Sequence, residues 1–130
     1  MNLKNNKNAI SCFNRALELN PNHVPSWIHK GIILGKYKKY QESIDCFDKV
    51  LELDPENIDA LVSKAVNLWT MEQWDESTKY FNKALEIDPE SEFVKIAQRT
   101  TFENGSSERQ HNRTPKQKVE ENKDIQSKLL

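Results

Sequence analysis

The chain has 130 residues, a length typical of a single domain. Its formal net charge is -1, and charges of both signs are interspersed, which excludes a whole-chain positive field that would attract nucleic acid or an acidic membrane. Hydrophobic residues make up only 36% of the chain, which indicates that part of it contributes nothing to a core.

The chain shows no export or membrane signal. Its longest apolar run, residues 32–34, is far shorter than the roughly 20 residues needed to span a bilayer. The first eight residues are polar and do not resemble a signal peptide, so we expect a cytoplasmic location. The two cysteines, Cys12 and Cys46, are too few for a disulfide framework.

The first predicted helix is Ala9–Leu19, where small and apolar residues recur at spacings of three and four. An Asn-Pro pair follows it, and the residue before a proline is pushed out of the helical region. The same pattern returns without gaps at residues 43–55 and 77–89, so that helices of one kind recur with a period of 34 residues. Phenylalanine (Phe13, Phe47, Phe81) and proline (Pro21, Pro55, Pro89) both keep this period.

A second predicted helix precedes each of the two later copies. These helices are Val24–Tyr37 and Ile58–Met71, and a polar break at residues 38–39 or 72–73 separates each from its partner. Asn57 is a suitable N-cap, and a proline at position 25 is tolerated in a first turn. The chain is therefore predicted to form antiparallel helix pairs.

The helix pairs resemble the tetratricopeptide repeat family. The matching positions are Trp27, Gly31, Leu34, Tyr40, Ser43, Phe47, Val50 and Pro55, and then Leu61, Ala65, Leu68, Trp74, Ser77, Phe81, Ala84 and Pro89. The sequence departs from the pattern at Lys30 and Lys64, where leucine is usual, and at Leu34 and Leu68, where tyrosine is usual. The resemblance implies an all-α fold, in which stacked antiparallel helix pairs form a short right-handed superhelical solenoid.

The repeat register divides the chain into five parts. Residues 1–23 form a partial first repeat with only its second helix, residues 24–57 and 58–91 are complete repeats, residues 92–102 are a capping helix, and residues 103–130 are a disordered tail. We expect Phe93, Ile96 and Ala97 to face back onto the array. In the tail, Ile125 and Leu129 are spaced to form one helical turn against a partner.

The resemblance places a partner-binding groove on the concave face, which the first helix of each repeat forms. Its positions are Ile28, His29, Ile32, Lys36, Asp59, Val62, Ser63, Val66 and Trp69. Two interpretations remain open: the apolar members seal contacts between neighbouring repeats, or they hold a peptide or amphipathic helix with Trp69 as its anchor. The lysine, arginine and asparagine with which one branch of the family clamps a C-terminal carboxylate are not at the matching positions.

The first helix supports an alternative function. Ala9, Phe13 and Ala16 are expected to lack an intramolecular partner, and such uncovered solenoid ends favour self-assembly into a homodimer. A third interpretation is that the chain descends from a longer repeat protein and keeps a stable fold without a binding function of its own.

The sequence nominates no catalytic, metal or cofactor site. No nucleophile has a recognisable base and orienting residue, no His or Cys spacing suits a metal, and no glycine-rich phosphate loop is present. Cys12 and Cys46 occupy one repeat position about 8–10 Å apart, too far for a disulfide, and are expected to be buried or half-buried. We therefore predict a non-enzymatic adaptor that binds a protein or peptide.

Overall fold

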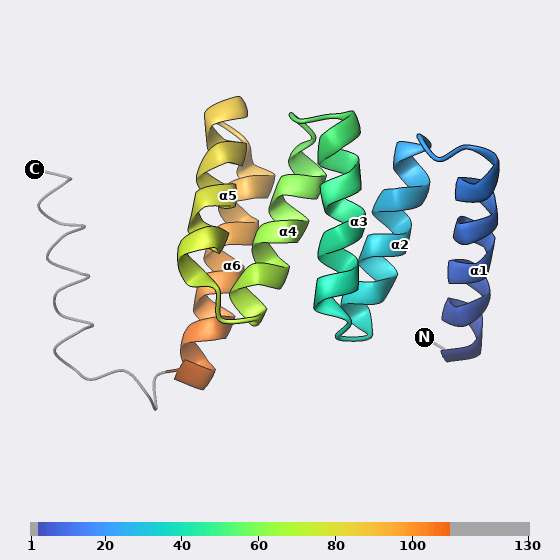
Figure 1. The fold of residues 1–130 in the computed structure, drawn as a ribbon. Coiled ribbons are helices and arrows are strands. Elements are labelled where there is room, and N and C mark those ends of the chain that lie inside the picture. Colours follow the sequence, from blue (N-terminus) through green and yellow to red (C-terminus); the bar gives the residue numbers. More distant parts are fainter. Residues whose placement is uncertain (1–2, 110–130) are drawn as a thin grey trace, which may run out of the picture.

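The computed structural model describes the backbone of residues 3–109 and the side chains of residues 5–103. This part of the chain contains α-helices and no strand: α1 (Leu3–Leu19), α2 (Val24–Lys36), α3 (Tyr40–Leu53), α4 (Ile58–Thr70), α5 (Trp74–Ile87) and α6 (Glu92–Arg109). The helices lie side by side in an extended array, with α1 at one end and with α5 and α6 at the other (Figure 1). The predicted all-α architecture of stacked antiparallel helix pairs is confirmed.

Helix α1 is longer than the sequence predicted, because it begins at Leu3 and not at Ala9. The added residues are rich in lysine and asparagine, and asparagine is a poor helix former that carries no amphipathic signal. One of them, Asn6, is nonetheless buried in the array. Tertiary packing therefore extends this helix beyond what local propensity indicates.

The turn within each complete repeat has the same backbone geometry. Lys38 and Glu72, which are 34 residues apart, have φ angles of 63° and 65°. The amide of the next residue then reaches back five positions to a helix carbonyl: Lys39 N to Leu34 O at 3.0 Å, and Gln73 N to Leu68 O at 2.9 Å. These bonds satisfy carbonyl groups that the ends of α2 and α4 would otherwise leave open. The predicted polar breaks are therefore tight helix-ending turns.

Close packing of the two helices in a repeat depends on a small residue opposite a phenylalanine. A Cβ atom built on Gly31 would lie 2.8 Å from Phe47 Cζ, so no larger side chain fits between α2 and α3 without movement. One repeat later, Ala65 and Phe81 are fully buried at the equivalent positions of α4 and α5. Gly31 and Ala65 therefore allow the paired helices to approach closely.

Two buried serines fasten the paired helices, a role that the sequence did not reveal. Ser43 Oγ donates to Gly31 O at 2.6 Å, and Ser77 Oγ donates to Ala65 O at 2.6 Å. Asn67 Nδ2 also donates to Ser43 Oγ at 2.8 Å, which joins one repeat to the next. Because these hydroxyl groups are buried, each hydrogen bond avoids the cost of an unsatisfied polar group.

Helix boundaries otherwise follow the sequence closely. Tyr37 and Met71, which were predicted to end α2 and α4, are the C-cap residues immediately after them. Asn57 caps α4 as predicted, because its Oδ1 accepts a hydrogen bond from Ala60 N at 3.0 Å. Differences of one residue are within the ordinary uncertainty of a helix end.

The C-terminal helix differs from the prediction in length and orientation. Helix α6 continues to Arg109, so residues 103–109 are helical, contrary to the predicted tail; residues 110–130, with Ile125 and Leu129, lie outside the described part. Phe93 and Ile96 do not face back onto the array but are exposed, because Val94 and Phe102 take that role. Ala97 does pack against the core, as expected.

Candidate functional site

The groove residues proposed from the sequence differ widely in accessibility. On α2, Ile28 is half-buried, whereas His29, Ile32 and Lys36 are exposed; on α4, Asp59 is exposed, Ser63, Val66 and Trp69 are half-buried, and Val62 is buried. Val62 belongs to the core that α4 forms with α5 and α6. For Val62, the sealing interpretation is therefore correct.

Trp69 is not the exposed groove anchor that the sequence suggested. Its ring centroid lies 4.3 Å from that of Phe102 on α6 and 6.3 Å from that of Trp74. Phe102 also packs edge-on against Phe81, at a centroid distance of 5.7 Å. Because α6 carries Phe102 onto α4, the end of the α4 face that includes Trp69 is covered by the chain itself.

Three apolar side chains remain exposed at positions that line the proposed groove. Ile32 on α2 is 40% exposed, and Phe93 and Ile96 on α6 are 54% and 49% exposed. Ile96 lies two repeats after Ile28, and Phe93 lies one repeat after Asp59, so both occupy the register of groove residues. The sequence could have indicated these two residues if the repeat register had been continued beyond residue 91.

The outer face of α1 is less open than expected at one residue. The Phe13 ring stacks on the His29 imidazole of α2, with centroids 5.6 Å apart and planes 18° apart, so Phe13 has an intramolecular partner. Ala9 and Ala16 are half-buried as well. Leu19, in contrast, is 88% exposed, and Cys12 is exposed, contrary to its predicted burial.

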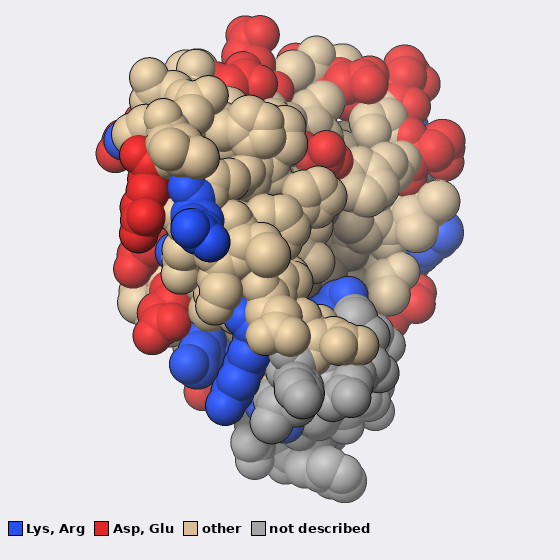
Figure 2. Space-filling model, turned by 90° about the vertical axis from the view of Figure 1, so that its right-hand side faces the viewer, with Lys and Arg blue, Asp and Glu red and all other residues tan. Residues whose placement is uncertain are grey.

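The α1 end of the array includes one area without charged side chains. Figure 2 faces this end and shows the area, with acidic side chains along its upper rim and basic side chains to its left and below it. The exposed residues Cys12 and Leu19 are seven positions apart and therefore lie on the same side of α1. Among residues 3–109, the only helix that packs against α1 is α2.

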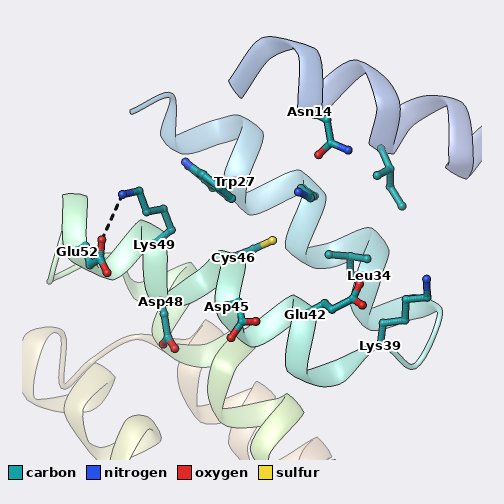
Figure 3. Close-up of a pocket in the computed structure, with 12 residues that line it drawn as sticks. Asn14, Trp27, Leu34, Lys39, Glu42, Asp45, Cys46, Asp48, Lys49 and Glu52 are labelled. Carbon is teal, nitrogen blue, oxygen red and sulfur yellow. Dashed lines mark hydrogen bonds and ion pairs between the residues drawn. The ribbon is translucent and has the colours of Figure 1, made fainter. Parts of the chain in front are cut away.

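A cleft of about 620 Å³ opens between α1, α2 and α3, and we call it the α1–α3 cleft (Figure 3). The sequence did not reveal it. The residues that line it are Ile10, Asn14, Trp27, Lys30, Leu34, Lys39, Glu42, Asp45, Cys46, Asp48, Lys49 and Glu52. The cleft lies on the side of the array formed by the second helices of the repeats, away from the proposed groove.

Two interactions stiffen the lining of the α1–α3 cleft. The Trp27 indole Nε1 donates to Pro21 O at 2.7 Å, which fixes the ring plane. Lys49 Nζ forms an ion pair with Glu52 Oε2 at 3.3 Å.

Burial raises the pKa of the Cys46 thiol to about 11, although the nearby Lys30 charge acts to lower it. Cys46 is therefore a neutral, inert thiol at physiological pH.

The equivalent groove between α3 and α5 is bridged by side chains. Lys64 Nζ on α4 donates to Asp48 Oδ1 on α3 at 2.5 Å and to Tyr80 Oη on α5 at 2.9 Å. The same ammonium lies 4.2 Å from the centroid of the Tyr80 ring. Burial acts to lower the pKa of Lys64, but the hydrogen bonds to Asp48 and Tyr80 outweigh it, so that the pKa is raised.

The described residues offer no further chemical centre. Within them, no group of three or more His, Cys, Asp or Glu side chains is placed to hold a metal ion. None of the helices in residues 3–109 combines the length and the hydropathy needed to cross a membrane.

Comparison with known families identifies the fold. Two family models of the tetratricopeptide repeat match this chain, one over residues 24–57 and the other over residues 1–23 and 58–91. The chain therefore belongs to the tetratricopeptide repeat family. No curated protein matches the sequence.

Solved structures of the same architecture include three informative neighbours. The Arabidopsis OM64 TPR domain is 17% identical, covers 78% of this chain and 84% of its own, and has a TM-score of 0.69, a similarity that concerns the fold. YrrB is 27% identical over 75% of this chain, with a TM-score of 0.68. MamA is 26% identical over 65% of this chain, with a TM-score of 0.64. The chain spans about half the length of YrrB and of MamA.

Proposed function

We propose that this chain is a non-enzymatic adaptor whose concave face holds a peptide or helix of a partner protein. The observation that carries the proposal is the exposure of Ile32, Phe93 and Ile96 in the register of the groove. Exposed apolar side chains in a concave surface lose contact with water when a partner covers them, which favours association. YrrB, a structural neighbour, is described as a TPR protein with an unusual peptide-binding site.

The structure changes which residues we expect to carry binding. Trp69 and Val62 support the fold, because one is covered by Phe102 and the other is buried. The working surface in this proposal consists of Ile28, His29, Ile32, Lys36, Asp59, Ser63 and Val66, extended by Phe93 and Ile96. It has few charges, so we expect the partner to contribute apolar side chains and not a terminal carboxylate.

Photo-crosslinking tests this proposal at single positions. A photoreactive amino acid at Ile32 or Phe93 should crosslink a partner protein from native extract, whereas the same group at Leu53 should not. Leu53 is a matched control, because it is also a partly exposed apolar residue but lies on a second helix. Ile32→Glu combined with Phe93→Glu should abolish the same product without lowering the melting temperature. Crosslinking from Leu53 alone would contradict the proposal.

A second candidate function is self-association through α1. The observation that favours it is the area without charged side chains at the α1 end, together with the exposure of Leu19 and Cys12 on α1. Burial of this surface against a second copy would give a two-fold homodimer. Sedimentation of the wild type beside a Leu19→Glu, Cys12→Glu variant measures it, since the variant should be monomeric if α1 forms the interface. A wild type that is monomeric at all accessible concentrations would exclude this function.

A further inference from the structure

The α1–α3 cleft and the bridged groove are built on equivalent repeat positions, and they differ at both positions that bind the lysine of the bridged groove. Lys30 is the equivalent of Lys64, since the two lie 34 residues apart. At the positions of Asp48 and Tyr80, which bind Lys64, the first groove has Asn14 and Cys46. Among the described residues, no carboxylate forms an ion pair with Lys30. Its Nζ instead lies 5.6 Å from the centroid of the Trp27 ring.

The substitution of a ring by a thiol accounts for the space. One repeat later, the Tyr80 ring packs on Lys64 and on the core. Cys46 is too short to reach across in the same way, and Figure 3 shows it on one wall of the cleft, with Asn14 on the facing helix. The resulting volume of about 620 Å³ is within the range of about 300–1,000 Å³ typical of ligand pockets.

We propose that the α1–α3 cleft is a docking site for a tyrosine side chain of a partner protein. The phenol oxygen would accept a hydrogen bond from Lys30 Nζ, and the ring would lie on the ammonium and beside Trp27. The molecule contains the template for this arrangement, because Lys64 and Tyr80 make the same hydrogen bond and cation–π contact within the chain.

The charges around the cleft favour a neutral phenol over an anion. The α3 wall carries Glu42, Asp45, Asp48 and Glu52, whereas the basic members of the lining are Lys30, Lys39 and Lys49. Because Asp48 is paired with Lys64 and Glu52 with Lys49, the charges that remain in the lining are two of each sign, and the cleft has no net attraction for a carboxylate or phosphate. A phenol provides an acceptor for the ammonium and an apolar ring without a negative charge.

We expect the tyrosine to come from a different protein. The three tyrosines of this chain, Tyr37, Tyr40 and Tyr80, are all half-buried in the array. Residues 110–130 contain no Phe, Tyr or Trp, so this segment cannot supply the ring, and the half-buried tyrosines of a second copy are poorly placed to do so. The α1–α3 cleft is also separate from the concave face, so an absence of tyrosine binding in the cleft would not affect the proposal for the groove.

The first experiment uses N-acetyltyrosinamide as the probe and observes amide and indole shifts by NMR. We expect shifts confined to the cleft, including the Trp27 indole, and weaker binding of N-acetylphenylalaninamide, which lacks the phenol oxygen. Lys30→Met should weaken tyrosine binding about tenfold, because it removes the charged donor. Lys79→Met is the matched control and should leave binding unchanged, since Lys79 is an exposed lysine on α5, outside both the cleft and the proposed groove.

A second variant tests the cleft independently of Lys30. Cys46→Tyr places a ring where Tyr80 stands one repeat later, so it should fill the cleft, eliminate the probe shifts and raise the melting temperature. The proposal is overturned if a folded Cys46→Tyr variant binds the probe as the wild type does. It is also overturned if Lys30→Met has no effect, or if the probe shifts only residues of the concave face.

Discussion

Two grooves on the same side of this array are formed by equivalent positions of the repeat and have different contents. Between α3 and α5, an ammonium joins a carboxylate to a phenol, through Lys64, Asp48 and Tyr80. Between α1 and α3, the equivalent ammonium of Lys30 faces Asn14 and Cys46, and a cleft remains. The comparison teaches that the repeat preserves positions that hold helices together, whereas the positions between second helices vary and decide which surface is open.

The two ends of the array also differ in how much of their surface other helices cover. At one end, α6 places Phe102 on Trp69 and Phe81, which covers the last repeat. At the other end, α1 contacts only α2 among the described helices, and its outer face is left with Leu19 and Cys12 exposed. The C-terminal end of the described array is therefore covered by α6, whereas α1 has a described helix on one side only.

The largest expected contrast is between the three equivalent phenylalanines. Phe47→Ala and Phe81→Ala should each lower the free energy of unfolding by about 3–5 kcal/mol, because both rings are fully buried. Phe13→Ala should cost only about 1 kcal/mol, since that ring is half-buried and its main described partner is His29. Denaturant unfolding measures all three; equal losses would show that α1 is packed as tightly as α3 and α5.

The cap provides the next contrast. Phe102→Ala should lower the free energy of unfolding by about 2 kcal/mol, because the half-buried ring contacts both Trp69 and Phe81. Phe93→Ala, on the same helix but 54% exposed, is the control and should be nearly neutral. Urea denaturation and the tryptophan emission maximum report on the change. If both variants were neutral, α6 would contribute no stability as a cap.

Exchanging equivalent residues between the two grooves should change the free energy of unfolding less than the substitutions of buried phenylalanines do. Asp48→Asn should cost about 0.5–1 kcal/mol at pH 7, a modest value because the Asp48 side chain is 43% exposed. Asn14→Asp should raise the free energy of unfolding by up to about 0.5 kcal/mol, since it gives Lys30 a carboxylate as an ion-pair partner. Stability at pH 7 should be compared by urea denaturation for each variant and for the pair.

The pH dependence of the bridge follows from the raised pKa of Lys64. Its stabilising contribution is complete below the ordinary value of 10.5 and is lost as the pH rises through the higher value in the folded state. The difference between the wild type and Asp48→Asn should therefore be constant near neutrality and shrink above about pH 10.5. A difference that persisted unchanged at higher pH would mean that the charge on Lys64 does not stabilise the bridge.

The smallest expected effect on stability, but a clear one on reactivity, concerns the two cysteines. At pH 8, a thiol reagent should modify Cys46 at least about a hundredfold more slowly than Cys12, because burial raises the pKa of Cys46 to about 11 and shields it. The Cys12→Ser and Cys46→Ser variants isolate the two rates. In denaturant the rates should become similar, and similar rates in the native state would show that the cleft wall opens readily.

Much of the fold could be predicted from the sequence because its information is local and periodic. The 34-residue period, the Asp-Pro and Asn-Pro helix ends and the amphipathic spacing predicted the helix pairs and their buried phenylalanines. The N-cap at Asn57 follows from a single residue with a well-known role and was predicted correctly.

The candidate sites depended on contacts between residues far apart in the chain. That Trp69 lies beneath Phe102 follows from the position of α6 on α4, and no local pattern reports how far a terminal helix turns back. In the α1–α3 cleft, Cys46 is much smaller than the equivalent Tyr80, and Asn14 lacks the charge of the equivalent Asp48, so neither side chain bridges to Lys30. Sequence periodicity determines which face of each helix is buried, but only the packed array decides whether facing side chains meet, because that depends on their combined size and charge.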